Sequence, residues 1–283
     1  MNEEQPSAGD NAAPSVEVEG LERLIPVDEH IEEELEDGGH RVRRRGIFLL
    51  PNLLTTGALF AGFYSIVNAI NGQFEAAAIA IFFAMLLDGL DGRVARLMRA
   101  QSAFGAEYDS LCDMVSFGVA PALLAFTWGV AQLGKVGLAA AFIYSACAAL
   151  RLARFNTQIT LADKRYFTGL ASPAAAALLA AWVWSWHQTF PVAALVPRSF
   201  AWLTAVLTMV AGVAMVLSAR YYSFKEFDLG GRVPFALLLG VVFVFFLISL
   251  DPPRMLLLSF GLYALSGPFM ALWNRRKQKV TNS

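Results

Sequence analysis

The sequence predicts an all-α polytopic membrane protein with about eight transmembrane helices and both termini in the cytoplasm. Three observations predict this class. Hydrophobic residues make up 57% of the 283 residues and charged residues only 16%, against about 25% charged in an ordinary soluble domain. Runs of roughly 18 or more apolar residues recur, as helices that cross a bilayer require. Lysine and arginine gather on one side of these runs.

Eight hydrophobic segments follow one another along the chain. The second ends in charged residues before it completes a span of about 20 residues, so we expect its helix to continue as an amphipathic extension out of the membrane. From residue 41 onwards, 18 basic residues lie on the side assigned to the cytoplasm and three lie outside, which fits the positive-inside rule. The segments cover residues 49–70, 74–93, 109–132, 136–155, 170–188, 199–218, 234–250 and 254–273.

These segments divide the chain into three parts. Residues 1–45 form an acidic cytoplasmic tail that ends in a basic run; 13 of the 23 acidic residues lie within 1–40, a composition typical of flexible segments. Residues 46–218 would form a six-helix catalytic membrane core. Residues 219–283 would add two further transmembrane helices and a basic C-terminal tail. None of the three histidines lies in the acidic stretch described next, so histidine-based catalysis is not expected there.

Four aspartates lie in the stretch of residues 86–121. Asp88 and Asp91 are three residues apart, and Asp109 and Asp113 are four apart. On a helix either spacing brings two side chains to one face. Because only a short loop joins the two helices, we expect antiparallel neighbours whose acidic faces converge near the cytoplasmic interface. The alternative is a set of solvated charges at a membrane edge, but ionisable residues within membrane segments usually serve a function.

A divalent cation would explain this convergence. Carboxylates that meet in a medium of low dielectric constant repel one another. Their oxygen atoms favour Mg²⁺, Mn²⁺ or Ca²⁺ over softer metals, and Mg²⁺ keeps coordination positions for water or substrate phosphate. The sequence therefore predicts a metal site completed by a phosphate-bearing ligand. Gly89, Gly92 and Gly105 would admit a ligand or close helix packing, and Arg96 is suited to phosphate.

The spacing of these residues resembles the signature of the CDP-alcohol phosphotransferases. It reads D-x2-D-G-x2-A-R-x8-G-x3-D-x3-D from Asp88 to Asp113, with Ala95 and Gly105 among its eight fixed positions. The longer stretches "FLLPNLLTTGALFAGFYSIVNAINGQFE", "ALRLARFNTQ" and "KRYFTGLASPAAAA" are similar to the bacterial CDP-diacylglycerol–serine O-phosphatidyltransferases, the phosphatidylserine synthases. This likeness extends from about residue 48 to residue 180.

The resemblance implies a fold, a location and a reaction. The fold is a six-helix core, assembled as a homodimer in the inner (cytoplasmic) membrane with its active site on the cytoplasmic side. Asp88, Asp91 and Asp109 would hold Mg²⁺ or Mn²⁺ against the diphosphate of CDP-diacylglycerol. Asp113 would complete the metal group and act as the general base for the hydroxyl of L-serine, so that phosphatidylserine forms and CMP leaves. The resemblance, and not the spacing, selects Asp113 as the base.

The same resemblance indicates residues that would bind the substrates. Gly92, Arg96 and Gly105 would lie against the nucleotide and its phosphates. Asn52 and Thr55 would also touch the nucleotide, unless they only cap the first helix. The carboxylate of L-serine needs a cation, for which arginine is suited, although basic residues here also serve membrane topology. The candidates for the acceptor side are Arg151, Arg154, Ser116, Asn156, Lys164 and Arg165.

Two alternative functions stay open at this point. A sibling enzyme would keep the same core and take glycerol 3-phosphate or inositol as its acceptor. A cation transporter would use the acids as an ion relay, but transporters place such sites near the midplane, among internal repeats. Here the acids lie at one end of their helices and no repeat is visible. As partners we expect CDP-diacylglycerol, L-serine and membrane lipids, and no nucleic acid.

Overall fold

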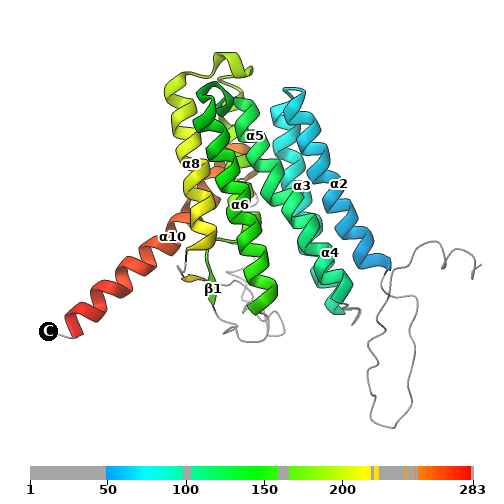
Figure 1. The fold of residues 1–283 in the computed structure, drawn as a ribbon, viewed down its shortest axis with the longest axis vertical. Coiled ribbons are helices and arrows are strands. Elements are labelled where there is room, and N and C mark those ends of the chain that lie inside the picture. Colours follow the sequence, from blue (N-terminus) through cyan, green and yellow to red (C-terminus); the bar gives the residue numbers. More distant parts are fainter. Residues whose placement is uncertain are drawn as a thin grey trace, which may run out of the picture. The chain divides into compact units, whose positions relative to one another are not determined.

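Helices form nearly all of the regular structure in the part of the chain that can be described (Figure 1). The computed structural model describes residues 49–97, 103–158, 166–217, 220–222, 240, 246 and 248–281. The predicted acidic tail and most of the predicted segment 234–250 lie outside these residues. The longer helices are α2 (Leu49–Ile70), α3 (Phe74–Leu97), α4 (Ala103–Asp113), α5 (Ala120–Trp128), α6 (Lys135–Gln158), α7 (Ser172–His187), α8 (Arg198–Val216) and α10 (Pro252–Thr281).

Helices α2 and α3 form an antiparallel hairpin with a tight turn. Gly72 has a φ of 75°, a left-handed conformation that glycine adopts without a steric penalty at a helix end. The backbone N–H of Gln73 donates to the carbonyl of Asn68 at 2.8 Å, which closes the turn. Further along the hairpin, the Ser65 hydroxyl donates to the carbonyl of Ala77 at 2.8 Å. The two helices therefore lie in close contact, and α3 continues as predicted beyond residue 93.

A π-helix joins α4 to α5 into one continuous rod. This π-helix, η1, spans Met114–Val119 and ends two residues before Pro121, which lies in the first turn of α5. Proline has no N–H to donate to a carbonyl one turn earlier, and such a gap favours a local widening of the helix. Helix α6 supplies hydroxyl donors here: Tyr144 donates at 3.1 Å to the carbonyl of Phe117, four residues before Pro121, and Ser145 donates at 3.0 Å to that of Gly118.

Helix α7 lies at the centre of the packing. It contacts α3, α5, η1, α8 and α10. Eleven of its 16 residues are buried, most of them alanines, so neighbouring helices can approach closely. On α10, Phe260 and Tyr263 pack against the buried cluster that includes Leu178 and Leu179. Strand β1 (Tyr166–Thr168) pairs antiparallel with β2 (Arg220–Tyr222), which contacts α10.

Four helical stretches among the described residues are long and apolar enough to cross a membrane. This finding supports the predicted all-α membrane protein. Helix α3 is not among the four and is charged at its C-terminal end. Helix α7 has 16 residues, and at about 1.5 Å per residue it is shorter than a hydrocarbon core of about 30 Å. Eight spans, cytoplasmic termini and the boundaries at 46–218 and 219–283 stay predictions. The four stretches are Leu50–Ile70, Phe104–Trp128, Lys135–Thr157 and Arg198–Val216.

Candidate functional site

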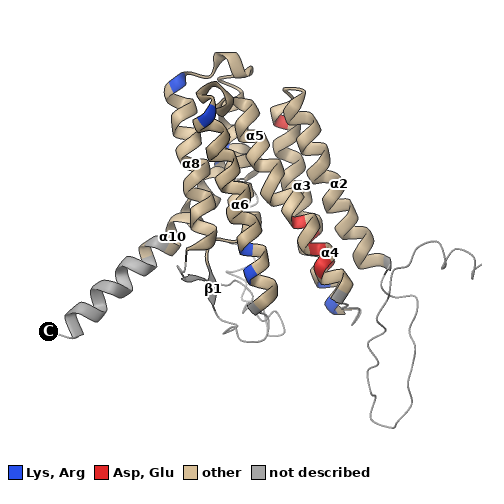
Figure 2. Cartoon of the chain, viewed as in Figure 1, with Lys and Arg blue, Asp and Glu red and all other residues tan. Residues whose placement is uncertain are grey.

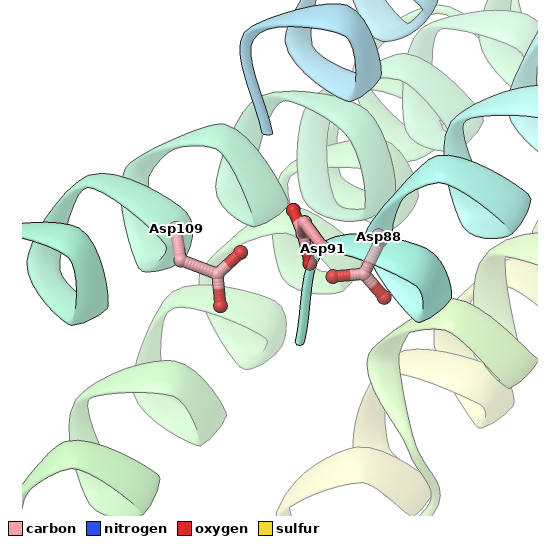
Figure 3. Close-up of side chains that lie close together, drawn as sticks. All are labelled: Asp88, Asp91 and Asp109. Carbon is pink, nitrogen blue, oxygen red and sulfur yellow. The ribbon is translucent and has the colours of Figure 1, made fainter. Parts of the chain in front are cut away.

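Three aspartates from two neighbouring helices meet near the C-terminal end of α3. Asp88 and Asp91 lie on α3 and Asp109 lies on α4, and one carboxylate oxygen from each lies within 4.8 Å of the others. Figure 3 shows the three side chains pointing into a common space. Asp91 is buried, while Asp88 and Asp109 are partly exposed. The predicted convergence of the two acidic helix faces is therefore present for these three residues.

The local sequence explains how this group forms. Helix α3 is unbroken from Phe74 to Leu97, so the spacing of three residues keeps Asp88 and Asp91 on one face. Helix α4 begins at Ala103, six residues before the predicted segment start at residue 109. About 1.7 turns of α4 therefore separate its first residue from Asp109, and the residues around Asp109 contact both α2 and α6.

Asp113 is the last residue of α4 and lies beside this group rather than within it. Its carboxyl group lies within hydrogen-bonding reach of that of Asp88. The fourth aspartate is thus tied to the first, and all four predicted acids belong to one connected cluster.

Helix α2 contributes a hydroxyl to this cluster. The Thr55 hydroxyl lies 2.7 Å from Oδ2 of Asp91, to which it donates, and 3.1 Å from the carbonyl oxygen of Pro51. Helix α2 begins at Leu49, so neither Asn52 nor Thr55 occupies the N-cap position, and the capping interpretation is wrong for both. The carbonyl of Asn52 accepts a hydrogen bond from the Thr56 hydroxyl at 2.7 Å.

The glycines next to the acids border open space. A Cβ atom placed on Gly89 or Gly92 would meet no atom of the described residues within 4 Å, so these two glycines do not serve close packing between the described helices. Gly62 of α2 differs, because a Cβ there would clash with the side chain of Ser116. Arg96 lies one turn beyond Gly92 on α3 and is exposed, and Gly105 lies one turn before Asp109 on α4. The face of α3 around Gly92 has room for a ligand.

The acceptor candidates fall into different surroundings. Arg151 and Arg154 lie near the C-terminal end of α6, at the same end of the helices as the acids of α3 and α4 (Figure 2). Nη1 of Arg154 donates to the carbonyl of Val216, the last residue of α8, at 3.2 Å. Ser116 is buried and donates to the carbonyl of Ala58 at 3.0 Å, so packing between α2 and η1 accounts for it. Lys164 and Arg165 lie outside the described residues.

The two residues that flank Asp109, Tyr108 and Ser110, were not predicted. The hydroxyl of Tyr108 shares a hydrogen bond of 2.9 Å with that of Thr56, which links α4 to α2. On the other side, the Asn156 amide nitrogen donates to the Ser110 hydroxyl at 3.0 Å, which links α4 to α6. Asn156 also reaches Oε2 of Glu107 at 3.4 Å. Their only signal in the sequence is adjacency to Asp109, because the partners lie 46 to 52 residues away.

The donor chemistry of the group fits a divalent cation. Two like charges about 4 Å apart near a protein surface repel by about 4 kcal/mol, and three carboxylates here lie at comparable separations. Their oxygen atoms suit a hard cation such as Mg²⁺ or Mn²⁺. Such an ion usually keeps some coordination positions for water or phosphate, and the open face at Gly92 lies on the same helix. The residues that would hold it are Asp88, Asp91 and Asp109.

Comparison with known proteins places the chain in a family. The sequence profile of the CDP-alcohol phosphatidyltransferases matches residues 48–210. This range covers more than half of the chain and contains all four aspartates. The chain belongs to this family. The resemblance found in the sequence is therefore confirmed at the level of the family, and an enzyme of this family replaces the cation transporter considered above.

Two relatives of this phosphatidyltransferase, from different organisms, carry the same name. The CDP-diacylglycerol–serine O-phosphatidyltransferase of Helicobacter pylori is 35% identical over 223 residues, which cover 78% of this chain and 90% of that protein. The protein of the same name from Mycobacterium bovis is 45% identical over 143 residues, covering 47% of this chain and 49% of its own length. Among solved structures, Mycobacterium tuberculosis phosphatidylinositol phosphate synthase is 23% identical, with coverage of 59% and 85% and a TM-score of 0.40.

Proposed function

We propose that this phosphatidyltransferase transfers the phosphatidyl group of CDP-diacylglycerol to the hydroxyl of L-serine, giving phosphatidylserine and CMP. The observation that carries the proposal is the group of three carboxylates beside the open face of α3, within the region that matches the family. The serine acceptor is supported by the names of the relatives, above all the Helicobacter pylori protein that is matched over 90% of its length.

In this proposal the acidic cluster binds the donor substrate. Asp88, Asp91 and Asp109 would hold a divalent cation, which would supply positive charge against the diphosphate and the departing CMP phosphate. The absence of a side chain at Gly92 lets the nucleotide approach the backbone of α3. Arg96 lies one turn further on and contacts the phosphates through its guanidinium group. Gly105 and Asn52 border the nucleotide from α4 and α2.

Asp113 is the general base of the proposed reaction. Its carboxylate accepts the hydroxyl proton of L-serine, and the serine oxygen forms a bond to the phosphorus that carries the diacylglycerol. The bond from that phosphorus to the oxygen of CMP breaks, and CMP keeps the electron pair. The closeness of Asp113 to Asp88 places the base next to the metal-binding carboxylates. General-base assistance of this kind contributes about 10² to 10⁴ in rate.

The acceptor binds on the side of α6. Arg151 supplies a cation for the serine carboxylate, and Asn156, already bonded to Ser110 beside Asp109, lies where a polar acceptor meets α4. Lys164 and Arg165 follow in the next loop as further candidates. The basic residues around this end favour a cytoplasmic active site in the inner membrane. A homodimer and contacts with membrane lipids complete the proposal.

An acceptor panel tests the proposal directly. Purified protein in detergent receives CDP-diacylglycerol and one acceptor at a time: L-serine, glycerol 3-phosphate or inositol. We expect CMP release with L-serine alone, its loss on addition of a chelator, and its return with excess Mn²⁺ or Mg²⁺. Turnover with glycerol 3-phosphate or inositol and none with L-serine would identify a sibling enzyme. Turnover that survives complete chelation would remove the metal from the proposal.

A further inference from the structure

Asp91 differs from the other two carboxylates of the group in its surroundings. It is the only one of the three that is buried, with 4% of its surface exposed. Thr55, exposed by only 5%, donates a hydrogen bond of 2.7 Å to its Oδ2 atom. The two residues come from different helices, 36 positions apart in the chain. A hydroxyl of α2 therefore fixes the orientation of a carboxylate on α3.

The surroundings of Thr55 make this contact stiff. A β-branched side chain has few accessible χ1 rotamers in a helix. Its hydroxyl also lies 3.1 Å from the carbonyl of Pro51, one turn earlier, a geometry that threonine commonly adopts in helices. The single hydroxyl proton prefers the charged acceptor, since hydrogen bonds to carboxylates are roughly twice as strong as neutral ones. The Thr55 hydroxyl is therefore held in one position when it donates to Asp91.

We infer that Thr55 is a positioning residue for the metal site: its hydroxyl holds the Asp91 carboxylate in the orientation that binds the divalent cation. The inference rests on the proposed function only in taking the three aspartates as metal ligands. It replaces the expectation that Thr55 touches the nucleotide, because the hydroxyl is buried and already bonded within the protein. Groups that orient metal ligands in this way typically change metal affinity by about 10- to 100-fold when removed.

Three variants separate this role from ordinary packing. Thr55→Val keeps the shape of the side chain and removes the hydroxyl. Thr55→Ser keeps the hydroxyl and removes the methyl group. Thr127→Val is the control, because Thr127 of α5 is partly buried and, like Thr55, has its hydroxyl on a carbonyl one turn earlier, that of Leu123 at 2.8 Å.

The measurement is Mn²⁺ binding to each purified protein without substrates, by titration with paramagnetic resonance of the free ion. We expect Thr55→Val to bind Mn²⁺ about 10- to 100-fold more weakly than the wild type. Thr55→Ser should stay within about threefold, and Thr127→Val should match the wild type. At saturating Mn²⁺, the KM of Thr55→Val for CDP-diacylglycerol should return to the wild-type value.

Several results would overturn the inference. Wild-type Mn²⁺ affinity in Thr55→Val would do so, and a raised KM for CDP-diacylglycerol at saturating Mn²⁺ would show that Thr55 binds the nucleotide instead. If Thr55→Val does not fold, Thr55→Cys, which keeps only a weak donor, is titrated in its place, and wild-type affinity there is equally decisive. Absence of Mn²⁺ binding in the wild type would also overturn it. The titration contains no acceptor. If the acceptor panel identifies an alcohol other than L-serine, the proposed function is wrong, but the conclusion about Thr55 and Mn²⁺ binding is unaffected.

Discussion

The two halves of α3 differ in how deeply they are buried and in the residues they carry. In the first half every turn is buried: Phe74, Ala77, Ala78, Ile81 and Ala84 are all almost fully enclosed by neighbouring helices. In the second half, from residue 85 to residue 97, Asp91 is the only buried residue. One continuous helix therefore passes from a packed apolar segment to an open segment that carries carboxylates and glycines.

This contrast separates stability from function along a single element. Small apolar side chains in the first half let α2 and α7 approach α3 closely, and close packing in a membrane depends on such residues. The second half leaves its surface unfilled and places like charges together, which costs free energy unless a ligand is bound. Substitutions in the two halves should consequently affect different measurements, and the predictions below test this separation.

The largest effect is expected at the charged end, from Asp113→Asn. Asparagine has nearly the same shape and can donate a hydrogen bond to Asp88, so the protein should fold and retain part of its Mn²⁺ affinity. It cannot accept the acceptor's proton, and CMP release from CDP-diacylglycerol should fall by about 10³-fold. The control is the melting temperature in detergent, which should stay close to that of the wild type. A rate within tenfold of the wild type would mean that another group is the base.

The next largest effect is expected in the packed half, from Ala78→Leu. Ala78 has no exposed surface, and extra methylene groups in a filled core cost about 1 to 3 kcal/mol. The melting temperature should fall clearly, while the Mn²⁺ affinity of the folded fraction stays unchanged. The matched variant in the open half is Gly89→Ala, where a Cβ meets nothing within 4 Å and alanine stabilises a helix by about 0.5 to 1 kcal/mol. Equal destabilisation by both variants would remove the distinction between the halves.

A smaller effect, confined to substrate binding, is expected from Gly92→Leu. The added side chain enters the open space beside the acids, so stability should be kept or slightly raised because leucine favours helices over glycine by up to about 1 kcal/mol. The KM for CDP-diacylglycerol should rise about tenfold, equivalent to about 1.4 kcal/mol of lost binding. Steady-state CMP release measures it. An unchanged KM would show that the nucleotide lies elsewhere.

The sequence was sufficient for those parts of this site that depend on local periodicity. The spacing of Asp88 and Asp91 fixes their common face, and helix α2 has the bounds that its apolar run predicts. Cross-helix partners were not predictable in this way. The bond from Thr55 to Asp91 joins residues 36 positions apart, and which hydroxyl of helix α2 faces which carboxylate depends on the rotation of two packed helices. Nothing in a single periodic pattern encodes that rotation.

The third helix shows where local patterns mislead. Hydropathy predicted a segment beginning at residue 109, but α4 begins at Ala103, because helical hydrogen bonding continues into polar residues outside the apolar run. The π-helix before Pro121 was also missed. Its broken ladder is completed by Tyr144, whose role is visible only once α6 lies beside η1. The first difference reflects backbone hydrogen bonding within α4 beyond its apolar run, and the second depends on a contact between helices.

The smallest effect is expected from Arg154→Gln, which extends the comparison from α3 to α6. Arg154 donates to the carbonyl of Val216, one of the last carbonyls of α8, which has no partner within its own helix. A cation at a helix C-terminus contributes about 0.3 to 1 kcal/mol, so the free energy of unfolding of Arg154→Gln should fall by about that amount.

The KM of Arg154→Gln for L-serine should stay within twofold of the wild-type value, whereas Arg151→Gln should raise it about tenfold if Arg151 binds the carboxylate. Steady-state kinetics and melting curves on both variants decide between the roles. A raised serine KM in Arg154→Gln at unchanged stability would assign that arginine to the acceptor after all, and the division between packing and binding residues would then not hold at this end of α6.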